Sequence, residues 1–382
     1  MSRIAKRRAA PAAAMVAAIL AGTAIGFWGQ AVAHGQAPAQ GQRPATATPP
    51  PPPGTIPPGE VIVGAGQVTP ILVDREKSVE FYGNLVKLII PPTRGSAPAY
   101  GAFGSPAGLM RMVGMPNTWT GILTGQPEVR FVMTRIPGSA MQVELEEFRH
   151  VDRVHARPKP QDPGAVTLIL LVRDINAAFT PLKQAGVNVV TTGGAPIALD
   201  AEGGTRGVLF TDPDGHYIEL LQADPLPATN APPDSNLIGA KLRLTVADTD
   251  KTLAFYRDAL KMPVAVGAFS EDPLAELMGI KGAQVRVTNA KIPGSALRLE
   301  FVEVKGVDRT PMTSDLNDPG SVRFTLRVKD VDSLTPKAVA AGGTIVSTGG
   351  ATVTLGGGNR YIVVRDPDNL LVQFVQSPPP AR

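Results

Sequence analysis

The 382-residue sequence predicts an α+β fold made by tandem duplication of one domain. Residues 135–148 and 291–304 share an Ile-Pro-Gly-Ser-Ala turn followed by alternating apolar and polar residues. Pro137 and Pro293 are 156 residues apart, and so are Pro163 and Pro319, each inside an Asp-Pro-Gly turn. Because one offset relates such distant segments, we interpret the chain as two copies of a domain of about 150 residues.

Each copy ends in an Asp-Pro-Asp turn and a strand. In the first copy the turn at 212–215 precedes a strand at 217–222 that carries Glu219 between apolar residues. Proline presets the backbone of such a turn, and aspartate accepts hydrogen bonds from its own main chain. The second copy, residues 364–375, repeats the turn and the strand but carries Gln373 in place of Glu219. The strand therefore does not need the charge, and Glu219 is a candidate for function.

Within each half the pattern β-α-β-β-β occurs twice. One helix of each half carries a Phe-Tyr pair, Phe81-Tyr82 or Phe255-Tyr256, which we expect to pack against a sheet. The two pairs are 174 residues apart, so the first half has about eighteen additional residues between Tyr82 and Arg135. We expect this insertion to be a loop that carries Trp119.

The first 33 residues have the features of a signal peptide. Basic residues at 3–8 precede the apolar run Ala12 to Trp28, and Ala31-Val32-Ala33 supplies a small-residue cleavage site. We therefore predict an exported protein, either periplasmic or secreted. An uncleaved membrane anchor with the remaining chain outside is the alternative, because the apolar run approaches spanning length.

The remaining boundaries follow from composition. We predict a disordered spacer rich in Pro, Gln and Ala at 34–60, domains at 61–224 and 237–377, a polar linker at 225–236 and a short tail at 378–382.

Charge and cysteine content exclude several classes of protein. The net charge is only +4, and the basic residues gather at the N-terminus without interleaved aromatics, so we expect no nucleic-acid partner. The chain has no cysteine, which excludes disulfides, thiolate metal sites and cysteine nucleophiles. Any metal would have to be held by oxygen and imidazole ligands. His150 and His155, on the connector between modules, are expected at the surface.

The helices at 76–82 and 250–256, with the two Asp-Pro-Asp turns, resemble those of the vicinal oxygen chelate superfamily, which includes glyoxalases, bleomycin-resistance proteins and ring-cleaving dioxygenases. The resemblance extends from about Val63 to Val375. It implies two tandem domains, each of two βαβββ modules that form a curled mixed sheet around a cleft. It does not imply one activity, since the superfamily contains lyases, isomerases, epimerases, oxygenases and metal-free binding proteins.

The resemblance also implies which positions would hold a metal: one in the first strand and one in the last strand of each module. In the first domain these positions carry Gln67, Glu144, Thr167 and Glu219, an all-oxygen set that suits Mg or Mn. In the second domain they carry Lys241, Glu300, Arg323 and Gln373, which favours an ion-pair cluster or an anionic ligand and no metal.

Three functions are compatible with these residues. We expect an exported protein that binds a small polar molecule without the full metal site of the family. The alternative is a metal-dependent lyase, isomerase or epimerase in the first domain, with Glu144 or Glu219 as the catalytic proton carrier. The third is a scaffold whose second domain only packs against the first. The substrate and the oligomeric state are left open.

Overall fold

The computed structural model describes residues 51–91, 128–271 and 273–379, and all structural statements refer to these. The expected signal peptide, the spacer up to residue 50 and the expected loop with Trp119 lie outside the described residues. No helix within the described ranges is both long and apolar enough to cross a membrane.

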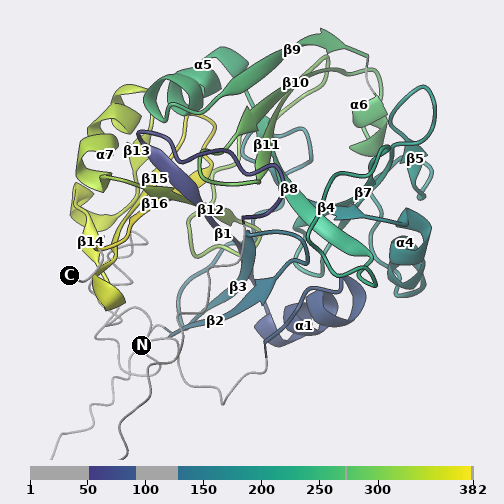
Figure 1. Cartoon of the computed structure of the whole chain (residues 1–382), viewed down its shortest axis with the longest axis horizontal. Coiled ribbons are helices and arrows are strands. Elements are labelled where there is room, and N and C mark those ends of the chain that lie inside the picture. The colour runs from purple at the N-terminus through teal and green to yellow at the C-terminus, as the bar shows by residue number, and fades with distance from the viewer. Residues whose placement is uncertain (1–50, 92–127, 272, 380–382) are drawn as a thin grey trace, which may run out of the picture. The chain divides into compact units, whose positions relative to one another are not determined.

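Four modules follow one another along the chain, as the repeats predict (Figure 1). The first consists of β1 (Ile62–Leu72), α1 (Arg75–Glu80), η1 (Phe81–Leu85), β2 (Glu128–Arg135) and β3 (Gln142–Arg149). The second consists of β4 (Val166–Val172), α4 (Ile175–Gln184), β5 (Ile197–Ala198), β6 (Arg206–Thr211) and β7 (Tyr217–Gln222). The third consists of β8 (Leu237–Val246), α5 (Thr249–Leu253), η3 (Ala254–Ala259), β9 (Val264–Ser270), α6 (Pro273–Leu277), β10 (Gln284–Lys291) and β11 (Arg298–Lys305). The fourth consists of β12 (Val322–Val328), α7 (Val331–Ala340), β13 (Thr344–Ile345), η4 (Thr348–Gly350), β14 (Val353–Thr354), η5 (Gly356–Gly358), β15 (Arg360–Arg365) and β16 (Leu371–Gln376).

The first helix of every module begins at an aspartate cap. Asp74, Asp174, Asp248 and Asp330 are extended, and the carboxylate of each accepts hydrogen bonds from backbone N–H groups two or three residues further on. Such caps satisfy donors that the first turn of a helix leaves free. The four helices therefore start at equivalent points after the first strand of each module.

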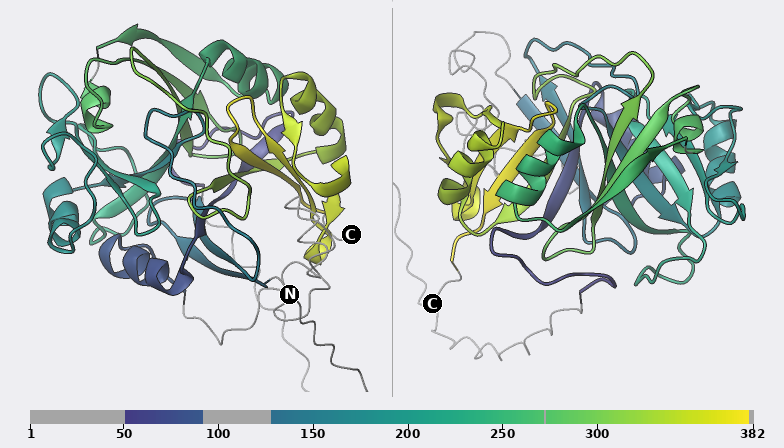
Figure 2. Two further views of the ribbon diagram at one scale, coloured as in Figure 1. Left: turned by 180° about the vertical axis from the view of Figure 1, so that it is seen from behind. Right: turned by 90° about the horizontal axis from the view of Figure 1, so that it is seen from above.

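The strands form two curled mixed sheets, which confirms the expected fold class (Figures 1 and 2). One sheet, here sheet A, has the order β13-β15-β16-β12-β1-β3-β2, with β14 beside β15. The other, sheet B, has the order β5-β6-β7-β4-β8-β11-β10-β9. In both sheets parallel pairs such as β1–β3 occur among antiparallel ones.

The sequence analysis predicts that the two modules of each half form one sheet, and this prediction is wrong. Sheet A joins the first and fourth modules through antiparallel β1 and β12, and sheet B joins the second and third through antiparallel β4 and β8. Each sheet thus takes one module from each half of the sequence. The first strands of the four modules are equivalent, so the repeat pattern identifies the modules without deciding which edges pair.

The two modules within each half of the sequence are instead linked by a helix against a turn. The Tyr82 hydroxyl donates to Asp212 Oδ2 over 2.9 Å, and the Ser78 hydroxyl donates to Asp214 Oδ2 over 2.9 Å. These bonds attach the helix of the first module to the Asp-Pro-Asp turn of the second. Because the four residues are buried, each carboxylate depends on these hydroxyls in place of water.

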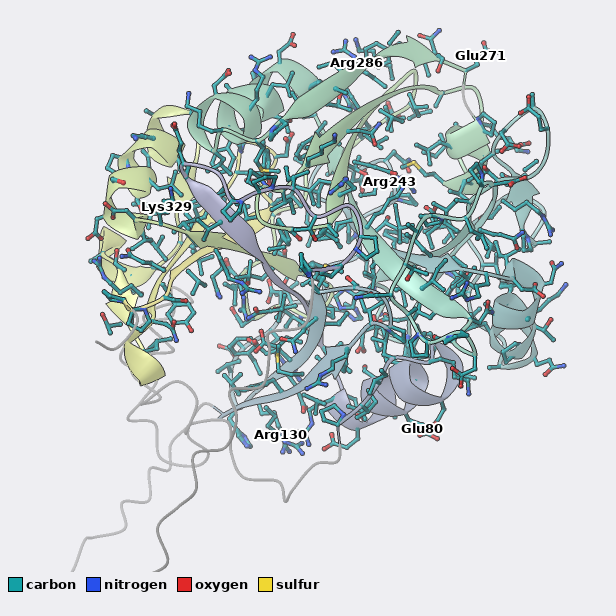
Figure 3. All side chains as sticks on the ribbon, in the orientation of Figure 1. Glu80, Arg130, Arg243, Glu271, Arg286 and Lys329 are labelled. Carbon is teal, nitrogen blue, oxygen red and sulfur yellow. The ribbon has the colours of Figure 1, made fainter. Side chains whose placement is uncertain are left out.

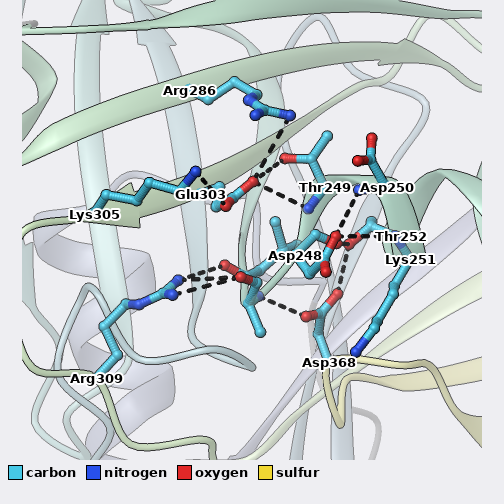
Figure 4. A network of polar contacts seen from close by, with 12 residues as sticks. Asp248, Thr249, Asp250, Lys251, Thr252, Arg286, Glu303, Lys305, Arg309 and Asp368 are labelled. Atoms are coloured by element: carbon cyan, nitrogen blue, oxygen red, sulfur yellow. Dashed lines mark hydrogen bonds and ion pairs between the residues drawn. The ribbon is translucent and has the colours of Figure 1, made fainter.

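The second half repeats this docking. Tyr256 donates to Asp366 Oδ2 over 2.9 Å, and Thr252 donates to Asp368 Oδ2 over 2.7 Å. Figure 4 shows Asp368 beside the start of α5, where its other oxygen accepts the backbone N–H of Ala247 over 2.6 Å. Sheets and docked helices together close the four modules into a ring.

Both Phe-Tyr pairs pack in the core, as expected. Tyr82 and Tyr256 are buried, and the rings of each Phe-Tyr pair meet edge to face at centroid distances of 5.4 Å and 5.1 Å. These residues belong to the large apolar cluster that lies between the helices and one face of each sheet. Hydrophobic burial and hydroxyl donation therefore come from the same side chain.

The last ten residues of the expected spacer contact the second half of the chain. Arg298 Nη2 donates to the carbonyl oxygen of Gly54 over 2.6 Å, and the N–H of Gly294 donates to the carbonyl oxygen of Ile56 over 3.0 Å. The composition of this stretch predicted a spacer. Tertiary hydrogen bonds to the 293–298 turn hold it in place.

We predict that Tyr256→Phe and Tyr82→Phe each lower the free energy of unfolding by about 1–3 kcal/mol, because each leaves a buried carboxylate without its hydroxyl donor. Urea denaturation followed by circular dichroism measures the change. Tyr361→Phe, which removes a hydroxyl from a half-buried ring, is the matched control. Equal effects in all three variants would contradict the docking role.

Candidate functional site

Side chains of the central strands alternate between two environments. Val68, Val143 and Phe324 belong to the core shared with the helices, so their neighbours Gln67, Glu144 and Arg323 point to the opposite face. We call this opposite face of each sheet the inner face. All eight positions assigned from the family pattern occur on the inner faces.

An arginine lies at the centre of the inner face of sheet A. Arg323 on β12 is only 1% exposed, and its Nη2 lies 3.2 Å from Glu144 Oε2 and 2.7 Å from Glu146 Oε2, both on β3. Thr69 on β1 lies between these strands and donates to Glu144 over 2.9 Å. The half-buried Gln67 also donates to Glu144, over 3.4 Å. The arginine therefore connects the fourth module to the first.

The inner face of sheet B has a corresponding cluster. Arg243 on β8 lies in the interior of the molecule, unlike the peripheral Arg130, Arg286 and Lys329 (Figure 3). It forms an ion pair with Glu219 on β7 through Nη1, and its Nη2 lies 2.9 Å from Glu300 Oε2 on β11. This arginine connects the third module to the second.

Lys241 completes the cluster of sheet B. Its ammonium lies 3.4 Å from Glu300 Oε1, and its side chain is 31% exposed. Thr167 on β4 pairs in register with Arg243 and is buried, so this short residue stands between the arginine and the strand that carries Glu219.

The structure regroups the sequence-predicted site. Gln67 and Glu144 lie in sheet A with Arg323 and Gln373, whereas Thr167 and Glu219 lie in sheet B with Lys241 and Glu300. The expected all-oxygen set of the first domain is therefore not assembled, because its two carboxylates belong to different sheets. The expected anion-binding set of the second domain is divided in the same way. Both differences follow from the exchange of modules between the sheets.

Sequence analysis missed three members of these clusters: Thr69, Glu146 and Arg243. Each follows an assigned position by two residues in the same strand and so points to the same face. This period-two relation could have identified them. The contacts of Glu146 and Arg243 with residues of another module could not be read from the repeat.

The two clusters differ in charge. In sheet B the two carboxylates face two cations, whereas in sheet A Glu144 and Glu146 share Arg323. Burial is the largest influence on the Glu146 pKa and raises it, and Glu144 adds to this, while Arg323 opposes both. Burial also raises the pKa of Glu219 against the opposing effect of Arg243. Burial by itself raises the pKa of Glu300, but Arg243 and Lys241 together outweigh burial, so the pKa of Glu300 is lowered.

These residues do not fit a divalent metal. A guanidinium stays protonated when buried, and it lies within hydrogen-bond distance of the carboxylates that would be the ligands. A metal would have to approach this fixed positive charge and compete for the same oxygens. Among the described residues no group of three or more His, Asp or Glu side chains is arranged for metal binding.

The three histidines within the described ranges lie outside both clusters. His150 is exposed, as expected, and His155 is half-buried, with Nε2 donating to the carbonyl oxygen of Asp214 over 2.6 Å. His216 is buried at the end of the turn, and its Nε2 donates to the carbonyl oxygen of Ile71 over 3.0 Å. These bonds support the turn at 212–215.

A family model described as the Glyoxalase/Bleomycin resistance protein/Dioxygenase superfamily matches residues 240–374. Those residues form a domain of this superfamily. The glyoxalase-superfamily domain spans β8 to β16 and contains one module from each sheet. A search of curated proteins found no match to the sequence.

Solved structures show the same fold over a longer part of the chain. Glyoxalase I from Zea mays is similar at a TM-score of 0.51 and 16% identity, covering 82% of this chain and 92% of that chain. A putative dioxygenase from Bacillus subtilis is similar at a TM-score of 0.51 and 12% identity, covering 84% of this chain and 87% of that chain. At these identities the similarity shows the fold and leaves the activity to the site residues.

We predict that Arg323→Met lowers the free energy of unfolding by about 3–5 kcal/mol, because it leaves Glu144 and Glu146 buried without a cation. Urea denaturation measures the loss. Replacing both glutamates by glutamine in the Arg323→Met background should restore most of it. Arg257→Met, which removes an exposed arginine paired with Asp258, should have little effect. A Met variant as stable as the parent would show that the cluster does not join the modules.

Proposed function

We propose that this chain is an exported glyoxalase-superfamily protein that binds a small polar molecule and uses no divalent metal at the family positions. The main observation that supports this proposal is the buried arginine at the centre of each inner face, which has two carboxylate partners. These arginines supply the positive charge that a metal would otherwise bring to the carboxylates. The family name itself groups bleomycin resistance proteins with glyoxalases and dioxygenases.

The arrangement gives no support to acid–base chemistry by Glu144 or Glu219. A general base needs a lone pair within reach of a substrate, and an electrophile must stabilise the charge that develops. Glu219 is fully buried and paired with Arg243, and Glu144 accepts hydrogen bonds from Gln67, Thr69 and Arg323. The two carboxylates act as partners of the arginines.

Arg323 is not a free cation for an anionic ligand on the inner face, because its guanidinium is already shared between two glutamates. Gln373, next to it in sheet A, donates to Thr325 over 3.4 Å. The sequence analysis assigned Arg323 and Gln373 to ligand binding, but our proposal does not place the ligand at these two residues. The ligand needs a site whose charges are not already compensated.

We predict that the mature protein contains well under one equivalent of any divalent metal, because the guanidinium occupies the centre of each ligand set. Elemental analysis of protein purified without chelators measures the content. Thermal shift with Mg, Mn, Zn, Fe and Ni should give changes within about 1 °C, since a bound ligand stabilises only the state that binds it. One equivalent of metal that raises the melting temperature would contradict the proposed function.

Export is tested independently of binding. Intact-mass analysis of the native protein should give a chain that begins at His34, since the cleavage site is predicted after Ala33. Ala31→Leu with Ala33→Leu should block processing and leave the protein with the membrane fraction. A cytoplasmic protein that retains Met1 would contradict export.

A further inference from the structure

A cleft of about 660 Å³ lies in the first half, beside the turn at 212–215. The helical residues Phe81 and Leu85, the connector 155–160, the loop 185–188 and the turn 211–215 line it. Its size falls in the range that small-molecule sites occupy. None of the buried charges of the two clusters lines this cleft.

One wall of the cleft is apolar, and its rim carries two cationic side chains. Phe81, Leu85 and Val187 contribute the apolar wall, and the exposed Arg157 and Lys159 stand at the rim. Within the part of the chain that the structure describes, neither cation forms an ion pair with a carboxylate; Arg157 Nη2 donates only to His155 Nδ1, over 3.3 Å. Their charges are therefore available to a ligand.

The carboxylates of the cleft are already engaged. Asp212 accepts from the Tyr82 hydroxyl through Oδ2 and from the backbone N–H groups of Asp214 and His216 through Oδ1. Asp214 accepts from the Ser78 hydroxyl. Burial, followed by the neighbouring Asp212, raises the pKa of Asp214. Both acids therefore already have hydrogen-bond donors within the protein.

The segment that carries the two cations is fixed in position. The Tyr217 hydroxyl donates to the carbonyl oxygen of Pro158 over 2.7 Å, and burial, followed by the charge of Asp162, raises the pKa of Tyr217 to about 12. The backbone N–H of Lys159 donates to Asp162 Oδ2 over 2.7 Å, and His155 donates to the carbonyl oxygen of Asp214 over 2.6 Å. Binding would thus order only the ends of two side chains, which lowers its entropic cost.

The second half provides an internal comparison, because the equivalent positions are packed more tightly. A Cβ atom on Gly343 would lie 3.0 Å from the Phe255 ring, and one on Gly342 would lie 3.3 Å from Pro367. A Cβ atom on Gly186, the equivalent of Gly342, would have no atom within 4 Å. Phe81 keeps 7% of its surface exposed, whereas Phe255 keeps none.

An ion pair also occupies the equivalent region of the second half. Arg365 donates to the carbonyl oxygen of Ser314 over 2.6 Å and lies 3.5 Å from Asp315. In the first half Thr211 replaces Arg365 and Lys159 replaces Asp315. The short threonine leaves the cleft open, and the lysine reverses the charge of its rim. Two copies of one fold therefore differ where a ligand would bind.

We propose that this cleft binds a small organic acid, with its carboxylate or phosphate at Arg157 and Lys159 and its apolar body against Phe81, Leu85 and Val187. The inference rests on the proposed function and names the site and the ligand class. A charge-assisted contact to arginine fixes the orientation of the acid, and the apolar wall selects acids that carry an aromatic or aliphatic group.

Calorimetric titration of the mature protein with phenylacetate, octanoate and phenyl phosphate tests the proposal, with 2-phenylethanol as the neutral analogue. The acids should bind at least about tenfold more tightly than the alcohol, and Arg157→Met with Lys159→Met should weaken them by a similar factor. Thr211→Arg with Lys159→Asp copies the second-half ion pair and should abolish binding. Lys251→Met with Lys329→Met removes two exposed charges elsewhere and should change nothing.

The outcomes separate the two proposals. Acid binding that survives both cleft variants would overturn this site and leave the proposed function in place. The absence of binding by every probe to the correctly folded wild type would overturn the ligand class, while the metal measurement decides the proposed function separately. Equal binding of alcohol and acid would overturn the role of the rim cations.

Discussion

The buried arginine at each junction between modules is the interaction on which the rest of the structure depends. Arg323 reaches from β12 across β1 to β3, and Arg243 reaches from β8 across β4 to β7. In both sheets a threonine, Thr69 or Thr167, stands on the intervening strand and leaves room for the guanidinium. Removing one partner would leave the other charge buried without compensation. The ion pairs therefore make each sheet specific for the modules that it joins.

The arginines come from different positions in the repeat. Arg323 occupies the position of Thr167, whereas Arg243 occupies the position of Thr69. A central cation therefore occurs in both sheets, at different positions of the repeat. In each sheet it compensates the charge of the carboxylates on the inner face.

Docked helices supply the second set of links. The Tyr82–Asp212 and Tyr256–Asp366 bonds hold together the two modules of each half, while the arginines hold together modules of different halves. With both types of link present, every module contacts two others through buried polar bonds. The open cleft of the first half lies beside one of these docked helices, so a ligand there would contact a rigid wall.

The sequence by itself determined the modules, the paired turns, the buried Phe-Tyr pairs and the strand positions of all eight candidate residues. These properties are local or periodic, so an offset of 156 residues and a period of two are enough to find them. Only the tertiary structure decided which modules share a sheet. Edge strands of equivalent modules offer the same backbone hydrogen bonds. Which two modules pair therefore depends on side chains that meet across three strands. The same reason separated Glu144 from Glu219 and brought Arg243 and Arg323 between the carboxylates.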